Sequence, residues 1–150
     1  MKKSIILGLI LTSLAVLGQA TDLPNPGQKL TKKQIAAWGD LPAYQIGKSQ
    51  FRVLPVKPDG TEATLVINAQ GVVGLSRNEV TISGLPAEQV QAGLGQITPQ
   101  PLSMQYFEQA DVTFARYADF GQAVAGFHAI QAALPEATLR LPIQFNRIPY

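Results

Sequence analysis

The change of hydrophobic periodicity along residues 71–145 constrains the fold more than any other feature of this sequence. Apolar residues alternate with polar ones in four stretches, which is typical of strands, and recur at three- and four-residue steps in two others, which is typical of helices. In chain order these stretches predict strand, helix, strand, strand, helix and strand, at residues 79–83, 86–97, 102–106, 112–116, 120–134 and 139–145.

Residues with special backbone preferences support these boundaries. Pro86 stands where the first turn of a helix tolerates proline, and Asp119 is a suitable N-cap for the second helix, which Pro135 ends. Pro142 lies inside the last predicted strand and has no N–H for a ladder hydrogen bond. We therefore expect that strand at an edge of its sheet.

With right-handed crossovers, this order predicts an α+β fold, the ferredoxin-like β-α-β-β-α-β sandwich with a four-stranded antiparallel sheet. The last strand of that fold lies at an edge, in agreement with the position of Pro142. Both helices cover one face of the sheet, so we expect the other face to be open to a partner, with Tyr106 or Tyr117 on it.

The first twenty residues have the order of a secretory signal. Lys2 and Lys3 precede an apolar run that ends near Leu17, and small residues follow up to Ala20. The alternative is a membrane anchor, but the run is shorter than the roughly 20 residues that a bilayer-spanning helix needs. We expect cleavage after Ala20 and a periplasmic or secreted protein.

Residues 21–48 are rich in proline and glycine and are interpreted as an N-terminal extension. A short helix is expected from Thr31, as its N-cap, to Trp38. Two interpretations of Trp38 remain open: an anchor for a partner, or part of a lid on the core of the chain itself.

Residues 49–70 predict a β-hairpin. Two β-rich stretches, 50–57 and 62–68, are joined by the turn-forming residues 58–61. An α+β domain over residues 71–145 and an extended tail over 146–150 complete the predicted organisation.

The mature chain offers little side-chain chemistry. It has no cysteine, and its one histidine, His128, has no second ligand nearby with which to hold a metal. No nucleophile-elbow motif and no phosphate-binding loop are present. Once Lys2 and Lys3 are removed, ten basic residues balance ten acidic ones, which disfavours binding to nucleic acid. We expect no enzymatic activity, no cofactor, no metal and, after signal removal, no membrane association.

From Ser76-Arg77-Asn78-Glu79-Val80 to Tyr150, about half of the chain, the pattern resembles the propeptide inhibitor domain of subtilisin-family serine proteases. The likeness rests on the order and length of the elements, the turn at 108–111, the second helix at 120–134, and a final strand that runs into an extended tail. Because no protease domain follows Tyr150, the chain is more similar to separately encoded propeptide-like proteins, such as the external chaperones of secreted kexin-like subtilisin proteases.

The resemblance implies an exported chaperone and inhibitor that blocks the protease cleft with its tail. An extended peptide can add as a strand to such a cleft, and the residues implied here are Asn146, Arg147, Ile148, Pro149 and Tyr150. Tyr150 would fill the primary specificity pocket as a product-like end with no bond to cleave. A kexin-like protease prefers a basic residue there, and the only base nearby is Arg147. The alternative is an ordinary flexible terminus.

The resemblance also assigns a role to Glu108 and Asp111. Propeptides of this family present carboxylates from the corresponding turn to the N-termini of two protease helices, whose free N–H groups attract anions. The alternative is that both acids are simply solvated residues of a hairpin turn.

Two other functions remain in view. One is a periplasmic protein-binding or assembly module that uses the open sheet face. The other is a small enzyme of the acylphosphatase kind, which needs an anion-binding loop with an arginine after the first strand, and residues 83–86 contain no arginine.

Overall fold

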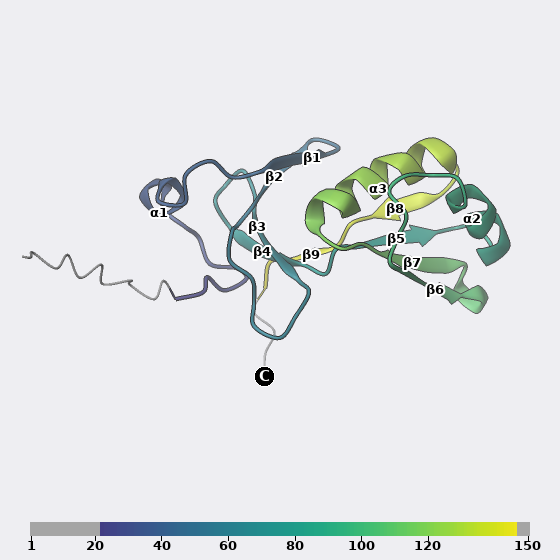
Figure 1. Ribbon diagram of the computed structural model, residues 1–150, viewed down its shortest axis with the longest axis horizontal. Coiled ribbons are helices and arrows are strands. Elements are labelled where there is room, and N and C mark those ends of the chain that lie inside the picture. The colour runs from purple at the N-terminus through teal and green to yellow at the C-terminus, as the bar shows by residue number, and fades with distance from the viewer. Residues whose placement is uncertain (1–21, 147–150) are drawn as a thin grey trace, which may run out of the picture.

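Two antiparallel sheets lie one after the other along the long axis of the molecule (Figure 1). The computed structural model describes residues 22–146, so the predicted signal peptide and residues 147–150 lie outside the described part. The strands are β1 (Ala43–Ile46), β2 (Ser49–Val53), β3 (Thr64–Ile67), β4 (Val73–Ser76), β5 (Glu79–Ser83), β6 (Ser103–Phe107), β7 (Val112–Arg116), β8 (Thr138–Arg140) and β9 (Ile143–Gln144). The α-helices are α1 (Lys32–Ala36), α2 (Ala87–Leu94) and α3 (Phe120–Ala133), and a short 3-10 helix, η1, spans Glu108–Ala110.

The four-stranded lobe consists of β5, α2, β6, β7, α3 and β8, in the predicted order. Its strands are arranged β6-β7-β5-β8, every neighbouring pair is antiparallel, and α2 and α3 cover one face (Figure 1). The predicted α+β class is therefore confirmed. The core between helices and sheet contains Val80, Ile82, Val90, Leu94, Ala115, Tyr117, Phe127 and Ile130.

Both predicted helix starts in this lobe are confirmed, and so is the N-cap of α1. Pro86 directly precedes α2, and the Asp119 carboxylate accepts a hydrogen bond of 2.8 Å from the Gln122 N–H at the start of α3. Thr31 accepts from the Gln34 N–H, while the Gln34 side chain accepts from the Thr31 N–H. These bonds satisfy N–H groups that have no partner inside the helix.

The five-stranded lobe, ordered β1-β2-β3-β4-β9, joins segments that the sequence analysis treats as separate. The predicted pairing of the two hairpin stretches is present, since β2 and β3 are antiparallel neighbours. However, β1 comes from the predicted extension, and β4 and β9 come from within residues 71–145. All four residues of β3 are buried, because the sheet has a core on both faces.

Trp38 is half-buried against the core of this lobe, together with Ile35 of α1. The residues that it covers are Leu30, Leu54, Leu65, Ile67 and Val73. The structure therefore favours the lid interpretation of Trp38 over the partner anchor.

Two segments cross between the sheets, and this corrects the single final strand predicted at 139–145. That stretch is two strands: β8 forms an edge of the four-stranded sheet and β9 forms an edge of the five-stranded one. The ladder breaks at Leu141 and Pro142, where proline has no N–H to donate. The opposite segment, β4 to β5, crosses in the reverse direction through Arg77 and Asn78. A domain boundary at residue 71 therefore does not separate the two sheets.

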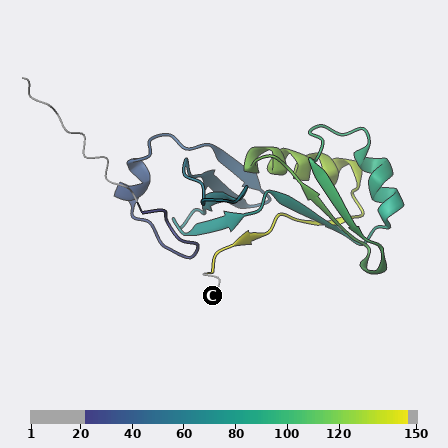
Figure 2. The ribbon, with the colours of Figure 1, turned by 60° about the horizontal axis from the view of Figure 1, so that its bottom comes forward.

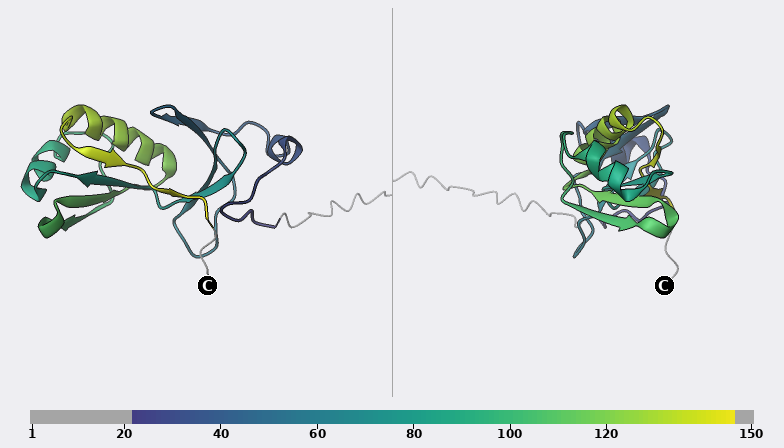
Figure 3. Two further views of the ribbon diagram at one scale, coloured as in Figure 1. Left: turned by 180° about the vertical axis from the view of Figure 1, so that it is seen from behind. Right: turned by 90° about the vertical axis from the view of Figure 1, so that its right-hand side faces the viewer.

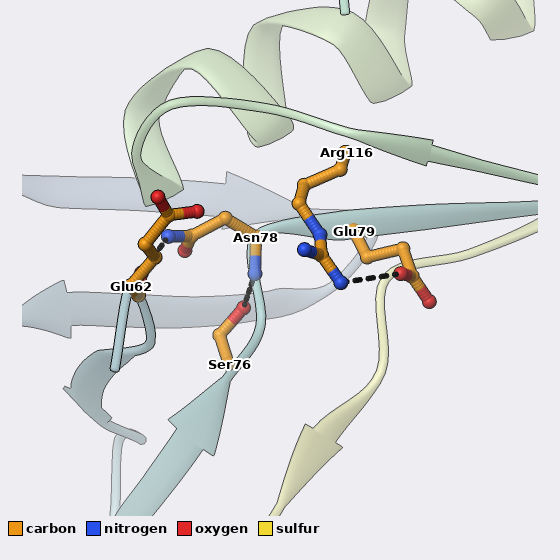
Figure 4. A network of polar contacts seen from close by, with 5 residues as sticks. All are labelled: Glu62, Ser76, Asn78, Glu79 and Arg116. Carbon is orange, nitrogen blue, oxygen red and sulfur yellow. Dashed lines mark hydrogen bonds and ion pairs between the residues drawn. The ribbon is translucent and has the colours of Figure 1, made fainter. Parts of the chain in front are cut away.

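Asn78 holds the crossing between β4 and β5 (Figure 4). Its φ of 57° is in the left-handed region, which asparagine tolerates better than most residues. Its backbone N–H donates to Ser76 Oγ over 3.1 Å, and its side-chain amide donates to the Glu62 carbonyl over 2.9 Å. The buried Asn78 thus ties the crossing to the loop before β3.

A shared hydrophobic cluster packs the N-terminal end of α3 against the five-stranded lobe. Phe120 is 1% exposed and meets the rings of Tyr44 and Phe51 edge-on, with centroids 5.8 and 6.3 Å apart. Farther along α3, His128 Nε2 lies 3.0 Å from the Gln45 carbonyl oxygen of β1. The lobes are therefore joined by side-chain packing as well as by the two crossing segments.

Candidate functional site

The fold leaves uncovered the face of the four-stranded sheet opposite α2 and α3 (Figure 2). Strand register places three rows of side chains on it: Ser103, Arg116 and Glu79, then Gln105, Phe114, Thr81 and Arg140, then Phe107, Val112, Ser83 and Thr138. None of these residues is buried, whereas the intervening rows on the helix side form the core. We call this surface the open face.

The tyrosines predicted on the open face lie elsewhere, which is a correction. Tyr106 packs against the core on the helix side, where its hydroxyl lies 3.3 Å from Met104 Sδ. Tyr117 is 1% exposed and lies so close to Gly126 of α3 that a Cβ there would collide with its ring. Burial raises the pKa of Tyr117 above its ordinary value, and its hydroxyl has no hydrogen-bond partner among residues 22–146.

An aromatic pair takes the place of the tyrosines. Phe107 and Phe114 on neighbouring strands stack edge-to-face, with ring centroids 5.3 Å apart, and Phe107 is 41% exposed. Exposed aromatics of this kind are enriched at protein interfaces. The alternation of Met104 and Tyr106 toward the core already places Phe107 outward, so strand parity was the signal that could have found it.

Charged residues border the aromatic pair. Arg116 Nη2 lies 3.9 Å from Glu79 Oε2 across neighbouring strands (Figure 4), and Arg140 lies in the same row as Phe114. The Arg116 side chain is 48% exposed, so the pair leaves most of its hydrogen-bonding capacity free for a partner.

The acidic turn predicted at Glu108 and Asp111 is continuous with the open face. Glu108 begins η1 directly after Phe107, and Asp111 ends it with a left-handed φ of 48°. The backbone of the turn is held in place because the Gly84 N–H donates to the Asp111 carbonyl over 3.0 Å. Both residues are exposed, and within residues 22–146 neither carboxylate has an ion-pair partner.

A hollow of about 450 Å³ lies beside this turn, lined by Tyr106, Phe107, Glu108, Gln109 and Ala110. It combines the exposed Phe107 ring with the Glu108 carboxylate. The hollow therefore places apolar and acidic residues side by side.

Of the predicted tail residues, only Asn146 is described, and it is exposed. Arg147, Ile148, Pro149 and Tyr150 lie outside the described residues. The chain reaches Asn146 from β9 on the five-stranded lobe, and not from the sheet that carries the open face. Figures 1 and 3 nevertheless show the end of the described chain on the side of the molecule away from α2 and α3, which is also the side of the open face.

Metal-binding clusters and membrane-spanning helices are two further features to consider in the described residues. Within 22–146, no three His, Cys, Asp or Glu side chains gather where they could hold a metal ion. No helix in that part of the chain has the length and apolar character required to span a bilayer. Comparisons with protein-family models, curated proteins and solved structures find no match for this chain.

Proposed function

We propose that this chain is an exported chaperone and inhibitor of a subtilisin-type serine protease. The open face and acidic turn dock on two helices of the protease, and the C-terminal residues enter its cleft. The observation that carries the proposal concerns β6 and β7, which bear the Phe107–Phe114 pair and are joined by the turn of Glu108 and Asp111. Their uncovered face lies on the side of the molecule away from α2 and α3, and the described chain ends on that side too (Figures 1 and 3).

The finer fold assignment belongs to this proposal. Counted within the four-stranded lobe, the strand order β6-β7-β5-β8 is 2-3-1-4, with two helices on one face. That order is the one expected for a ferredoxin-like sandwich, the fold that the resemblance to protease propeptides implies. A preformed sheet of this kind could organise two helices of a partner as the partner folds.

The acidic turn supplies the electrostatic part of the interface. A carboxylate beside a helix N-terminus contributes about 0.3–1 kcal/mol, and up to about 2 kcal/mol where it is partly buried. Two such contacts, at Glu108 and Asp111, therefore correspond to roughly a tenfold effect on affinity. Because the contacts form with the protease helices, they should support folding as well as inhibition.

The C-terminal residues supply the inhibitory part. A strand that adds to a cleft gains main-chain hydrogen bonds for affinity and side-chain pockets for specificity. Tyr150 suits an apolar primary pocket, and Arg147 is the only base available to a kexin-like pocket. Deletion of Ile148, Pro149 and Tyr150 should therefore weaken inhibition far more than it weakens assisted folding.

The test uses residues 21–150 with one subtilisin-type protease of apolar specificity and one kexin-like protease. Inhibition of peptide hydrolysis and recovery of activity from denatured protease are measured separately. Glu108→Gln with Asp111→Asn removes both charges while keeping the turn, and Glu88→Gln on α2 is the matched control on the helix side. The double variant should be about tenfold weaker in both assays, and the control should match the unaltered protein.

Absence of both inhibition and assisted folding with either protease would overturn the proposal. If the open face then captured a different exported protein, and loss of residues 148–150 had no effect, the chain would instead be a periplasmic binding or assembly module. Inhibition that is unchanged by the truncation would refute the role of the tail alone.

A further inference from the structure

The N-terminal and C-terminal segments of the described chain meet end to end on the outer edge of β4. Toward the end of β4, Leu75 and Ser76 pair with Gln144 and Ile143 of β9. Toward its start, the Val73 carbonyl accepts from the Gly27 N–H over 2.8 Å, and the Val73 N–H donates to the Gln28 carbonyl over 2.9 Å. One strand edge is therefore shared by two segments that are more than a hundred residues apart.

This sharing stops the β4–β9 ladder. Continued in register, the ladder would bring Asn146 opposite Val73. Both polar backbone groups of Val73 are already bonded to Gly27 and Gln28, so no partner remains for Asn146 on that edge. The chain must leave the sheet after Phe145.

We call the place where these two segments meet on the edge of β4 the joint. Two glycines make it possible. At Gly27, which has a φ of 85°, a Cβ would lie 2.5 Å from the Phe145 carbonyl oxygen. At Gly74 of β4, a Cβ would lie 2.5 Å from Ile143 Cγ2 and 2.8 Å from Phe145 Cε1. Phe145 is thus seated over Gly74 with its carbonyl group against Gly27. An open hollow of about 350 Å³ lies at the place where the chain leaves the sheet.

We infer that this joint is a positioning device for the inhibitory tail, with Gly27 and Gly74 as positioning residues. The segment around Gly27 ends the ladder at Phe145 and fixes the point at which the chain leaves the sheet. This inference rests on the proposed function, and it assigns a role to the five-stranded lobe. The lobe anchors the root of the tail, while the four-stranded lobe carries the docking face.

The expected consequence is preorganisation. If Phe145 loses its seat, it and Asn146 must be ordered when the complex forms, and each ordered residue has an entropic cost that reduces affinity. We expect inhibition about tenfold weaker or more, and only while the tail is present, because binding through the open face does not depend on the joint.

The test is a double-mutant cycle in the full mature chain. Gly74→Ala is combined with deletion of residues 148–150, and Gly95→Ala is the matched control, because its Cβ would meet nothing closer than 3.6 Å and its φ is −64°. Gly74→Ala should weaken inhibition by about tenfold with the tail and by less than twofold without it. An equal loss in both backgrounds, or no loss in either, would overturn the inference.

A second pair of variants guards against misfolding of the first. Gly27→Ala adds a Cβ against Phe145 at a positive φ, whereas Gly60→Ala, at a φ of 70°, adds one with nothing within 4 Å. The two variants share the backbone strain, so any difference between them reports the contact with Phe145. Gly27→Ala should show the tail-dependent loss, and Gly60→Ala should not.

Amide hydrogen exchange of the free protein separates this inference from the proposed function. Gly74→Ala and Gly27→Ala should speed exchange at Gln144 by tenfold or more, with no change in the two controls. If the unaltered protein inhibits no subtilisin-type protease, the proposed function fails while exchange still decides whether the joint holds β9. Exchange at Gln144 that is unchanged in both variants would overturn the inference even where inhibition is strong.

Discussion

Replacement of Tyr117 by phenylalanine should stabilise this protein. The Tyr117 side chain is 1% exposed, and its hydroxyl is buried without a hydrogen-bond partner in the described part of the chain, although its backbone N–H donates to the Asn78 carbonyl. A buried hydroxyl that has given up its hydrogen bonds to water costs about 1–3 kcal/mol. Tyr117→Phe removes that cost and keeps the ring, at the expense of a small gap beside Gly126. We expect a net gain of about 1 kcal/mol at pH 7, or roughly 3–5 °C in Tm.

The same substitution should change the response to alkaline pH. Burial raises the pKa of Tyr117, so the folded protein keeps this proton at pH values where the unfolded chain, with a pKa of about 10, releases it. The unfolded state then binds fewer protons than the native state, and the free energy of unfolding falls as pH rises above about 10, by at most about 1.4 kcal/mol per pH unit from this group. Below pH 9 this contribution is constant.

Urea denaturation followed by circular dichroism, at pH 7, 9, 10 and 10.5, measures both effects. The advantage of Tyr117→Phe should be constant up to pH 9 and then grow, because the phenylalanine variant lacks this titration. A loss of more than about 1 kcal/mol at pH 7 would mean that the hydroxyl has a partner in solution, since a hydrogen-bonded hydroxyl contributes about that much. An advantage that does not grow above pH 10 would refute the alkaline part of the reasoning.

Three further outcomes are expected in the same denaturation assay. Gly126→Ala should destabilise the protein by about 1–3 kcal/mol, because the new methyl group collides with the Tyr117 ring, and a loss below 0.5 kcal/mol would contradict that packing. Asp119→Ala should cost about 1 kcal/mol through the lost N-cap of α3, with Asp119→Asn, which keeps a capping oxygen, as the control. Arg116→Ala should change stability by less than about 0.5 kcal/mol, because its pair with Glu79 is long and exposed, and a larger loss would show that the pair is structural.

The four-stranded lobe could be predicted from the sequence because its elements have strong periodic patterns and clear end signals. The pattern of α3, with Asp119 before it and Pro135 after it, specifies a helix without knowledge of its neighbours. Strand β4 could not be predicted in this way. It contains Gly74, lacks alternation, and becomes a strand because β3 and β9 pair with it on either side. Local periodicity does not predict which distant segments will pair as strands.

The open face was predicted, but its residues were not. On β7 the larger apolar residues, Val112 and Phe114, point outward, while Thr113 and Ala115 lie against the helices, where small side chains leave room. Side-chain size alone would therefore assign the wrong face of β7 to the core, whereas the parity of Arg116, a residue that resists burial, indicates the correct one. The position of Phe145, directly before the tail, could not be foreseen because it depends on a contact with the distant Gly27.

The double crossing between the two sheets makes this chain hard to divide. A fragment that starts at residue 71 would keep β4 and β9 without β3, and would expose Leu75, Ile143 and Phe145 to water. A fragment that ends at residue 70 would lose β4 and β9 from its sheet. It would also lose the side chains that cover Val66. The two lobes should therefore melt in one cooperative transition, and neither can be transplanted into another protein as an independent module by a single cut in the chain.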